Sequence, residues 1–304
     1  MESPLVTFSN ELAALAARVS PAVVSVHGRR HTPSSGVLWR KEIIVTAEHS
    51  LRRDDEIPVT LGDGKQATAS LIGRDRGTDI AALRLEGLTQ PPAEFGAEEP
   101  RPGEITLVIG RSPNSGPNVS MGIISAVSGP WRTWRGGELD RYIRLDATVF
   151  PGSSGGAVVD HRGKVIGIAT SALSRIAGLA IPAKSVNRVV DLLLNKGSVP
   201  QAYLGVALQP VPMPESFQKK FALTGDRGIM VLNIESGGPA DKGGILVGDI
   251  VLDIEGKAVR TIEDLQSVLS SERIGKATGI RVIRGGELKD LTPVVGERAP
   301  GEIS

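Results

Sequence analysis

Between residues 22 and 181 the chain repeats one pattern, and this pattern constrains the fold more than any other feature. Short aliphatic runs such as Ile43–Thr46, Ile80–Leu85 and Ile105–Ile109 recur at intervals of roughly 10–15 residues. Gly, Pro, Asp and Asn cluster between the runs, and no helical period separates them. Short strands joined by turns are typical of antiparallel sandwiches and barrels. The sequence therefore predicts an all-β arrangement for this part of the chain.

The composition narrows the class of protein further. A chain of 304 residues predicts two or three domains. Lys and Arg number 35 against 34 Asp and Glu, a balance that argues against nucleic acid or an anionic membrane as the main partner. Cysteine is absent, which excludes disulfides, thiol nucleophiles and cysteine-bound metals. Since the four histidines are scattered, we expect no metal and no organic cofactor, and we interpret His27 and His31 as surface residues.

Helical spacing of apolar residues appears on both sides of the strand-rich part. It predicts one helix from about Ser9 or Asn10 to Val19, and a second over Lys184–Leu194 that stops before Gly197. Residues 195–200 are interpreted as a linker to a smaller unit. That unit contains several short strands, a helix over residues 262–269 and a hairpin that turns at Gly285-Gly286.

One Gly-rich segment carries candidate chemistry. Residues 150–156 read Phe-Pro-Gly-Ser-Ser-Gly-Gly, and the glycines around Ser154 let the backbone turn sharply and present its hydroxyl. A serine alone is a weak nucleophile, so catalysis requires a base and an orienting acid. A Gly-rich hairpin loop without chemistry is the alternative interpretation of this segment.

The order of residues along the chain distinguishes the known serine hydrolase arrangements. The α/β-hydrolase order requires Asp and then His after the serine, but the only later histidine is His161, which we expect to be a solvated turn residue. The subtilisin order requires an Asp before the His, and no Asp precedes His49. The order His, Asp, Ser fits, because His49 ends one aliphatic strand and Asp79 opens another before Ser154.

These motifs resemble those of a known family. The chain is similar to trypsin-fold serine proteases of the HtrA (Deg) type followed by one PDZ domain, over roughly residues 18–296. The matching segments are Ser20-Pro21-Ala22-Val23-Val24, Thr46-Ala47-Glu48-His49, Thr78-Asp79-Ile80-Ala81, Met121-Gly122-Ile123-Ile124-Ser125-Ala126, Pro151-Gly152-Ser153-Ser154-Gly155-Gly156, Tyr203-Leu204-Gly205-Val206, Gly237-Gly238-Pro239-Ala240 and Gly248-Asp249-Ile250-Val251. The family usually has Asn where this chain has Ser153, and it often has Asn at the position of Phe150. These two departures put the conformation of the oxyanion loop in question.

The resemblance implies an all-β protease domain over residues 1–200, with the chymotrypsin fold and two β-barrels at about 22–110 and 111–182. It implies a smaller PDZ domain, a β-barrel with helices, over residues 201–297, followed by a tail over 298–304. Family members commonly form trimers through N-terminal segments, so a homotrimer is expected.

The resemblance also assigns roles at the active site. Ser154 would attack a peptide carbonyl, His49 would act as the base, and Asp79 would orient the imidazole. The oxyanion loop would comprise Gly152, Ser153 and Ser154, with the N–H groups of Gly152 and Ser154 as donors.

The primary pocket is expected to have Thr148 and Val149 at its base. One wall would come from the segment Ile168, Ala169, Thr170 and Ser171. Thr148 cannot pair with a cation, so we expect cleavage after small or medium apolar residues. Asp146, two residues further back, is expected to face elsewhere.

The PDZ domain would bind C-terminal peptides. The backbone of the segment Tyr203, Leu204, Gly205 and Val206 would meet the carboxylate, while Leu265 and Leu269 would line the groove or simply form core.

The predicted function is therefore an ATP-independent serine endopeptidase acting on unfolded or damaged polypeptides. The alternatives are a peptide-binding scaffold or holdase chaperone with an idle triad, and, more distantly, an α/β-hydrolase esterase. No apolar run is long enough to span a membrane, and no signal peptide is visible. As written, the sequence indicates the cytoplasm, whereas the resemblance indicates the periplasm.

Overall fold

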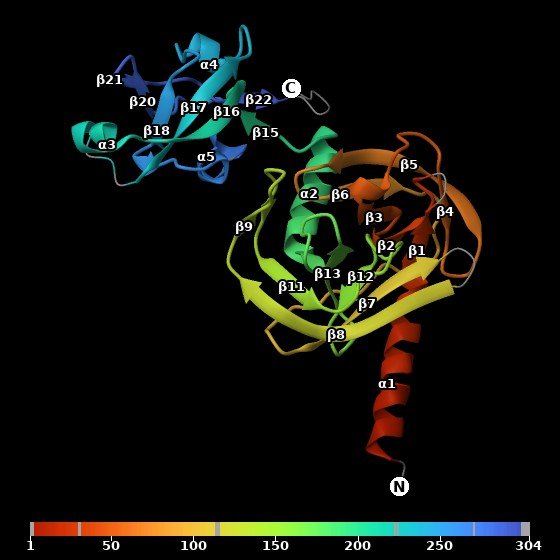
Figure 1. Ribbon diagram of the computed structural model, residues 1–304. Helices are drawn as coiled ribbons and strands as arrows, with labels where there is room; N and C mark the ends of the chain where they lie inside the picture. The colour runs from red at the N-terminus through yellow and green to blue at the C-terminus, as the bar shows by residue number, and fades with distance from the viewer. Residues whose placement is uncertain are drawn as a thin grey trace. The chain divides into compact units, whose positions relative to one another are not determined.

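The structure is a computed structural model, and its two parts are both built mainly of strands (Figure 1). Contacts divide the chain into two compact units, Met1–Val199 and Pro200–Ser304. The structure describes residues 3–29, 32–112, 116–221, 223, 225–269 and 271–298. The predictions for His31 as a surface residue and for a tail over residues 299–304 lie outside the described residues.

The first barrel closes six strands in the order β1-β2-β3-β6-β5-β4. All residues of β1 and β3 are buried, which explains why these strands appear in the sequence as continuous apolar runs. A 3-10 helix lies on either side of this region, η1 (Ser20–Ala22) before β1 and η2 (Glu48–Ser50) after β3. The strands are β1 (Val23–Val26), β2 (Ser34–Arg40), β3 (Ile43–Ala47), β4 (Ile57–Thr60), β5 (Gln66–Asp75) and β6 (Ile80–Arg84).

The second barrel also closes six strands, in the order β11-β14-β13-β12-β7-β8, so the predicted pair of barrels is confirmed. The division predicted at about residue 110 falls inside β7, which begins at Ile105 and pairs with β8 and β12, so the second barrel starts a few residues earlier. An aliphatic run indicates a strand but not the sheet that it joins. The strands are β7 (Ile105–Ser112), β8 (Gly116–Ser128), β11 (Tyr142–Asp146), β12 (Ala157–Val159), β13 (Val165–Thr170) and β14 (Leu179–Pro182), with a separate pair, β9 (Trp131–Arg132) and β10 (Glu138–Leu139).

Alternation along the strands builds two cores within this unit. Val108 on β7 and Ala169 on β13 pack inside the second barrel. Their neighbours Ile109 and Ile168 point the other way and join the core that both barrels share. Because successive side chains of a strand face opposite sides, one strand serves both cores.

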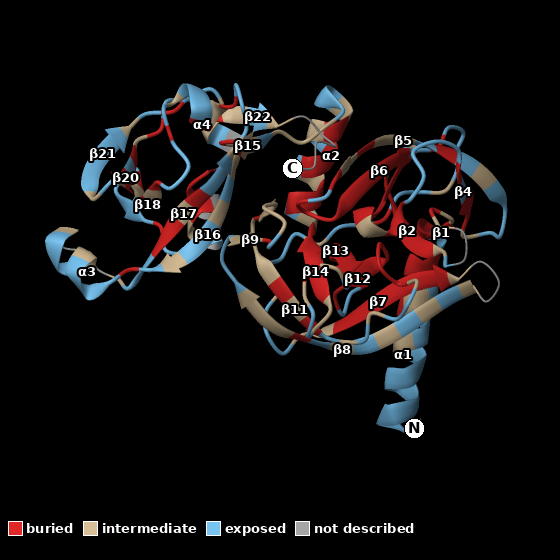
Figure 2. Cartoon of the chain, turned by 45° about the horizontal axis from the view of Figure 1, so that its top comes forward, coloured by how far each residue is buried: buried red, intermediate tan, exposed pale blue. Residues whose placement is uncertain are grey.

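Two helices flank the barrels. α1 (Pro4–Val19) begins earlier than predicted, and of its residues only Leu15 and Val19 are buried. Figure 2 shows its N-terminal turns exposed. α2 (Ala183–Lys196) buries an apolar stripe and ends at Gly197, whose φ of +71° forms the left-handed cap.

The second unit is organised around an open sheet of order β16-β17-β18-β20-β21, with β19 beside β18 and a separate pair of β15 and β22. The predicted hairpin joins β20 and β21, and both Gly285 and Gly286 have positive φ, as a two-residue turn of this kind requires. Arg298, assigned to the tail, instead ends β22 and pairs with Gln201. The elements are β15 (Gln201–Tyr203), β16 (Val206–Pro212), α3 (Glu215–Phe221), β17 (Arg227–Ile234), α4 (Pro239–Lys242), β18 (Ile250–Ile254), β19 (Lys257–Ala258), α5 (Ile262–Val268), η3 (Ser271–Arg273), β20 (Ile280–Arg284), β21 (Glu287–Leu291) and β22 (Gly296–Arg298).

Among the described residues, neither unit contains a helix with the length and apolarity needed to cross a membrane.

Candidate active site

His49 lies in η2, directly after strand β3, and its side chain is 21% exposed. Its Nδ1 is 2.9 Å from each carboxylate oxygen of Asp79. The backbone N–H of His49 also donates to Asp79 Oδ1, at 2.9 Å. The imidazole is therefore held through Nδ1, while Nε2 is left for other chemistry.

Asp79 is fully buried and strained. Its φ of +62° lies in the left-handed region, which is costly for a residue other than glycine. Asp75 braces the turn, because its carboxylate accepts from the Gly77 N–H at 3.1 Å and from Thr78 Oγ1 at 2.6 Å. Thr170 Oγ1 donates to Asp79 Oδ2 at 2.6 Å. The buried carboxylate therefore receives hydrogen bonds from both barrels, which compensates its loss of water.

A loop between β9 and β10 packs against the same turn. Thr133 Oγ1 donates to the carbonyl of Gly77 at 2.6 Å, and Arg135 Nη1 lies 3.8 Å from Asp79 Oδ1. Gly137 lies so close that an added Cβ would be 2.1 Å from the Gly77 carbonyl carbon. None of these three contacts was predicted, since residues far apart in sequence carry no local signal of this approach.

Ser154 lies in the turn that precedes β12 and is 6% exposed. It lines a cavity of about 280 Å³ together with His49, Phe150 and Gly152. Its Oγ is 3.1 Å from Ser171 Oγ. Among the hydrogen bonds of the described residues, none joins Ser154 Oγ to His49. The structure thus brings the three predicted residues to one place, with the serine hydroxyl turned to Ser171.

The loop that carries Ser154 leaves two N–H groups without a protein partner among the described residues. Among the described residues, no protein acceptor bonds the N–H of Gly152 or of Ser154. The N–H of Ser153 donates to the Phe150 carbonyl at 2.8 Å, so within the predicted oxyanion loop only Gly152 and Ser154 keep N–H groups for an oxyanion. Its buried hydroxyl donates to Asn118 Oδ1 at 2.8 Å.

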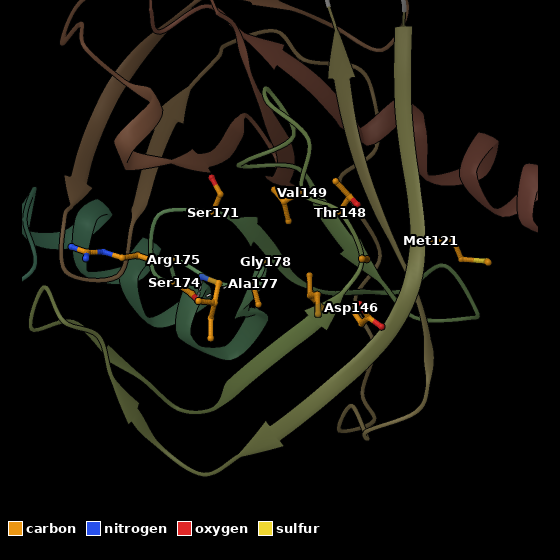
Figure 3. Close-up of a pocket in the computed structure, with 12 residues that line it drawn as sticks. Met121, Asp146, Thr148, Val149, Ser171, Ser174, Arg175, Ala177 and Gly178 are labelled. Carbon is orange, nitrogen blue, oxygen red and sulfur yellow. Dashed lines mark hydrogen bonds between the residues drawn. The ribbon is translucent and has the colours of Figure 1, made fainter.

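A second cavity, of about 500 Å³, adjoins the first through Val149 and Ser171, which line both. Figure 3 shows its lining side chains, with Met121 and Arg175 on opposite sides of the view. Thr148 and Val149 line it, whereas its other wall is formed by Ser171 and residues 174–178.

Three residues predicted for this wall lie elsewhere. Ile168 and Ala169 are buried in the two cores, and Thr170 is bound to Asp79. The wall begins only where β13 ends, because side chains inside the barrel sheet are already used in packing. Asp146 does line the cavity, contrary to expectation. It lies two positions before Thr148, and residues i and i+2 of an extended chain share a face.

In the second unit, the predicted peptide-binding segment crosses from β15 to β16. Leu204 is buried, Gly205 has a φ of +75°, and neither N–H has a partner among the described residues. Tyr203 packs against β22, with the Arg298 guanidinium 5.0 Å from its ring. Val206 opens β16, whose only described partner is β17, so one edge of β16 is free.

Of the two interpretations left open for Leu265 in α5 and Leu269 directly after it, groove or core, the structure favours the core. Leu265 and Leu269 are 7% and 6% exposed and pack in the main cluster of the unit. The helical period that placed them on one face could not distinguish a groove from the core beneath it.

The remaining histidines lie away from these sites. His161 is exposed in the turn before β13, as predicted. His27 is half-buried rather than on the surface. Its Nε2 lies 3.0 Å from Thr60 Oγ1, and burial lowers its pKa.

Comparison with known proteins agrees with this architecture. Residues 34–168 match the trypsin-like peptidase domain and residues 202–293 match the PDZ domain. A solved structure, the HtrA-type protease AlgW with tripeptide, is 32% identical with a TM-score of 0.72, and the alignment covers 95% of this chain and 97% of that one. The chain belongs to the HtrA-type trypsin-fold serine proteases.

Other known serine proteases show a similar relationship. The serine endoprotease from Yersinia pestis is 28% identical, with a TM-score of 0.73 over 94% of this chain and 98% of that one. A probable periplasmic serine endoprotease DegP-like of Halomonas elongata is 31% identical over 88% of this chain. Serine protease Do-like HtrB of Bacillus subtilis is 31% identical over 89% of it. The chain spans 57% and 63% of the lengths of these two curated relatives.

Proposed function

We propose that this chain is an ATP-independent serine endopeptidase that acts on unfolded or damaged polypeptides. One observation carries the proposal: His49, held by the buried Asp79, lines one cavity with Ser154, beside two N–H groups that have no acceptor among the described residues. Nucleophile, base, orienting acid and oxyanion donors are the parts that acyl transfer requires. All belong to the polypeptide itself, and no step calls for a nucleotide.

In the proposed mechanism, Ser154 Oγ attacks the carbonyl carbon of the scissile peptide bond. His49 Nε2 accepts the hydroxyl proton and then donates it to the leaving amine, while Asp79 stabilises the imidazolium. The N–H groups of Gly152 and Ser154 bind the negative oxygen of the tetrahedral intermediate. Water then releases the acyl group by the same steps. Rotation about the Cα–Cβ bond of Ser154 turns Oγ from Ser171 toward His49, and catalytic hydrogen bonds of this kind often tighten only with substrate bound.

Reaction with a fluorophosphonate probe tests this proposal. We expect wild type to be labelled at Ser154 and to cleave unfolded casein, and the folded Ser154→Ala variant to do neither. The contact between Ser154 and Ser171 supports one rival, a peptide-binding scaffold or holdase whose triad is idle. A folded wild type that resists the probe, with and without peptide, would favour that rival.

We propose that the cavity of about 500 Å³ receives the residue before the cleaved bond and prefers small or medium apolar side chains. Val149, Ala147 and Ala177 give it apolar walls, and Thr148 brings no charge. Peptides that differ only in Val, Ala, Leu, Phe or Arg at this position would measure the preference. A preference for Arg would contradict the proposal and would indicate that the Asp146 carboxylate pairs with the cationic side chain of the substrate.

The second unit is proposed to bind peptide C-termini by strand addition. The free edge of β16 supplies main-chain hydrogen bonds, and the N–H groups of Leu204 and Gly205 are available for a carboxylate. Calorimetry with peptides that end in a free carboxylate or an amide tests this, and equal affinities would contradict it.

A homotrimer is proposed from the exposed apolar residues of α1. Leu5, Val6 and Phe8 are 79%, 47% and 40% exposed, and burial against further copies would remove them from water. Light scattering of wild type and Phe8→Ser measures the assembly; a monomeric wild type would contradict the proposal.

A further inference from the structure

Ser35, on β2 of the first barrel, is completely buried, and it uses all of its polar groups around the active site. Its hydroxyl donates to the Gly152 carbonyl at 2.7 Å and accepts from the Arg111 N–H at 2.9 Å. Its N–H donates to the Ser154 carbonyl at 3.0 Å. Its carbonyl accepts from Thr46 Oγ1 at 2.6 Å, on the strand that leads to His49. One residue of the first barrel therefore binds the loop of the second barrel that carries the nucleophile.

The peptide unit between Gly152 and Ser153 lies between the two N–H groups of the candidate oxyanion hole. Ser35 Oγ holds its carbonyl, and the Phe150 carbonyl holds its N–H at 2.8 Å. Gly152 has a φ of +89° and no side chain to restrict its rotation. Holding this peptide unit at both ends therefore limits the directions in which the N–H groups of Gly152 and Ser154 can point.

Arg111 fixes the direction of the Ser35 hydroxyl. Because the Arg111 N–H occupies an acceptor position of Oγ, the hydroxyl proton remains for the Gly152 carbonyl. The Arg111 side chain is itself anchored, since it donates to the carbonyls of Val23 at 2.6 Å and Ser20 at 2.9 Å. The support thus extends from η1 through β7 to the loop.

We propose that Ser35 is a positioning residue that holds the oxyanion hole in the geometry required by the transition state. The inference rests on the proposed endopeptidase function and adds to it a residue outside the triad. A residue of this kind affects the tetrahedral intermediate more than the bound substrate, so its loss lowers kcat while KM changes little.

Ser35→Ala tests the inference with a fluorogenic peptide. We expect kcat to fall about 10- to 100-fold and KM to stay within about twofold, less than the loss of an oxyanion donor itself. The affinity for a peptide boronate, which forms a tetrahedral adduct, should fall by a similar factor. Ser35→Thr keeps the hydroxyl and should recover most of kcat.

Ser25→Ala is the matched control. Ser25 lies opposite Ser35 in the β1–β2 pair and is equally buried, but its Oγ has no hydrogen-bond partner in the part of the chain that the structure describes. We expect it to keep the wild-type kcat.

A wild-type kcat in Ser35→Ala, an effect confined to KM, or an equal loss in Ser25→Ala would each overturn the inference. If Ser35→Ala fails to fold, Ser35→Cys replaces it, because a thiol is a weak donor and should lower kcat in the same way. An inactive wild type would count against the proposed function, whereas an active wild type with an equally active Ser35→Ala would count against this inference alone.

Discussion

The two units differ in how they can engage an extended polypeptide. In the first unit the strands of both six-stranded sheets close into barrels, so neither barrel offers a free edge. In the second unit β16 ends an open sheet, and its outer edge is unpaired among the described strands. The closed unit must therefore act through its loops and side chains, whereas the open one can pair a peptide strand with the main chain of β16.

Buried polar groups follow the same division. Of the polar residues that the structure describes as buried, all except Asp249 and Thr278 lie in the first unit. Asp249 serves the fold of the second unit, because it pairs with Arg284 at 2.7 Å. Satisfied polar networks orient groups rigidly, and the first unit concentrates them around Asp79 and Ser154. The comparison teaches that the proposed catalysis depends on buried networks and the proposed peptide binding on an exposed edge.

Replacement of the buried Asp79 carboxylate should have the largest effect on catalysis. Asp79→Asn should lower kcat by about 10⁴-fold, because an amide stabilises the wrong imidazole tautomer. Peptide binding to the second unit should be unchanged, which calorimetry would check. Asp191→Asn is the control, since that carboxylate is 56% exposed and pairs with Arg40. Near-normal hydrolysis by Asp79→Asn would break the assignment of chemistry to the first unit.

Removal of one hydrogen bond to that carboxylate should have a smaller effect. Thr170→Val has nearly the same shape but cannot donate to Asp79, and we expect kcat to fall about 10- to 100-fold, as for a hydrogen bond to a charged group. Thr106→Val removes an equally buried hydrogen bond, to the Val159 carbonyl, and should keep kcat. Equal losses in both variants would indicate general destabilisation.

In the second unit, Gly205→Ala should weaken binding of a C-terminal peptide about 5- to 30-fold, because a left-handed φ costs roughly 1–2 kcal/mol for other residues. The φ of Gly205 is +75°, beside the available N–H groups. Gly256→Ala imposes the same strain at a φ of +74° in the β18–β19 turn and should leave affinity unchanged. Hydrolysis of a small ester should be unaffected in both variants. Its loss in Gly205→Ala would contradict the proposed assignment of catalysis to the first unit and peptide binding to the second.

The smallest effect concerns pH. All four histidines lie in the first unit, and burial lowers the pKa of His27 below its ordinary value. The unfolded chain then binds the proton more readily, so the contribution of His27 to stability is present above about pH 6.5 and is lost as pH falls through the folded pKa. His27→Gln should reduce the drop in melting temperature of the first unit on acidification. An unchanged drop would show that other groups cause it.

Much of the candidate site follows from the sequence because its signals are local or ordered along the chain. Glycines beside Ser154 indicate a sharp turn, and the order His49, Asp79, Ser154 distinguishes serine hydrolase arrangements. The pocket wall could not be predicted in the same way. Ile168 and Ala169 occur in an apolar run, and only the barrel shows that packing already occupies both faces.

The sequence alone determined the all-β first part, the ends of its helices near Val19 and Gly197, and the turn at Gly285-Gly286, because periodicity and backbone preference act over a few residues. Tertiary structure alone decided that β7 belongs to the second barrel, that Thr170 supports Asp79, and that Ser35 holds Gly152. The Thr170–Asp79 and Ser35–Gly152 contacts join residues 91 and 117 positions apart. Their partners are chosen by strand pairing and shared burial, which no local pattern records.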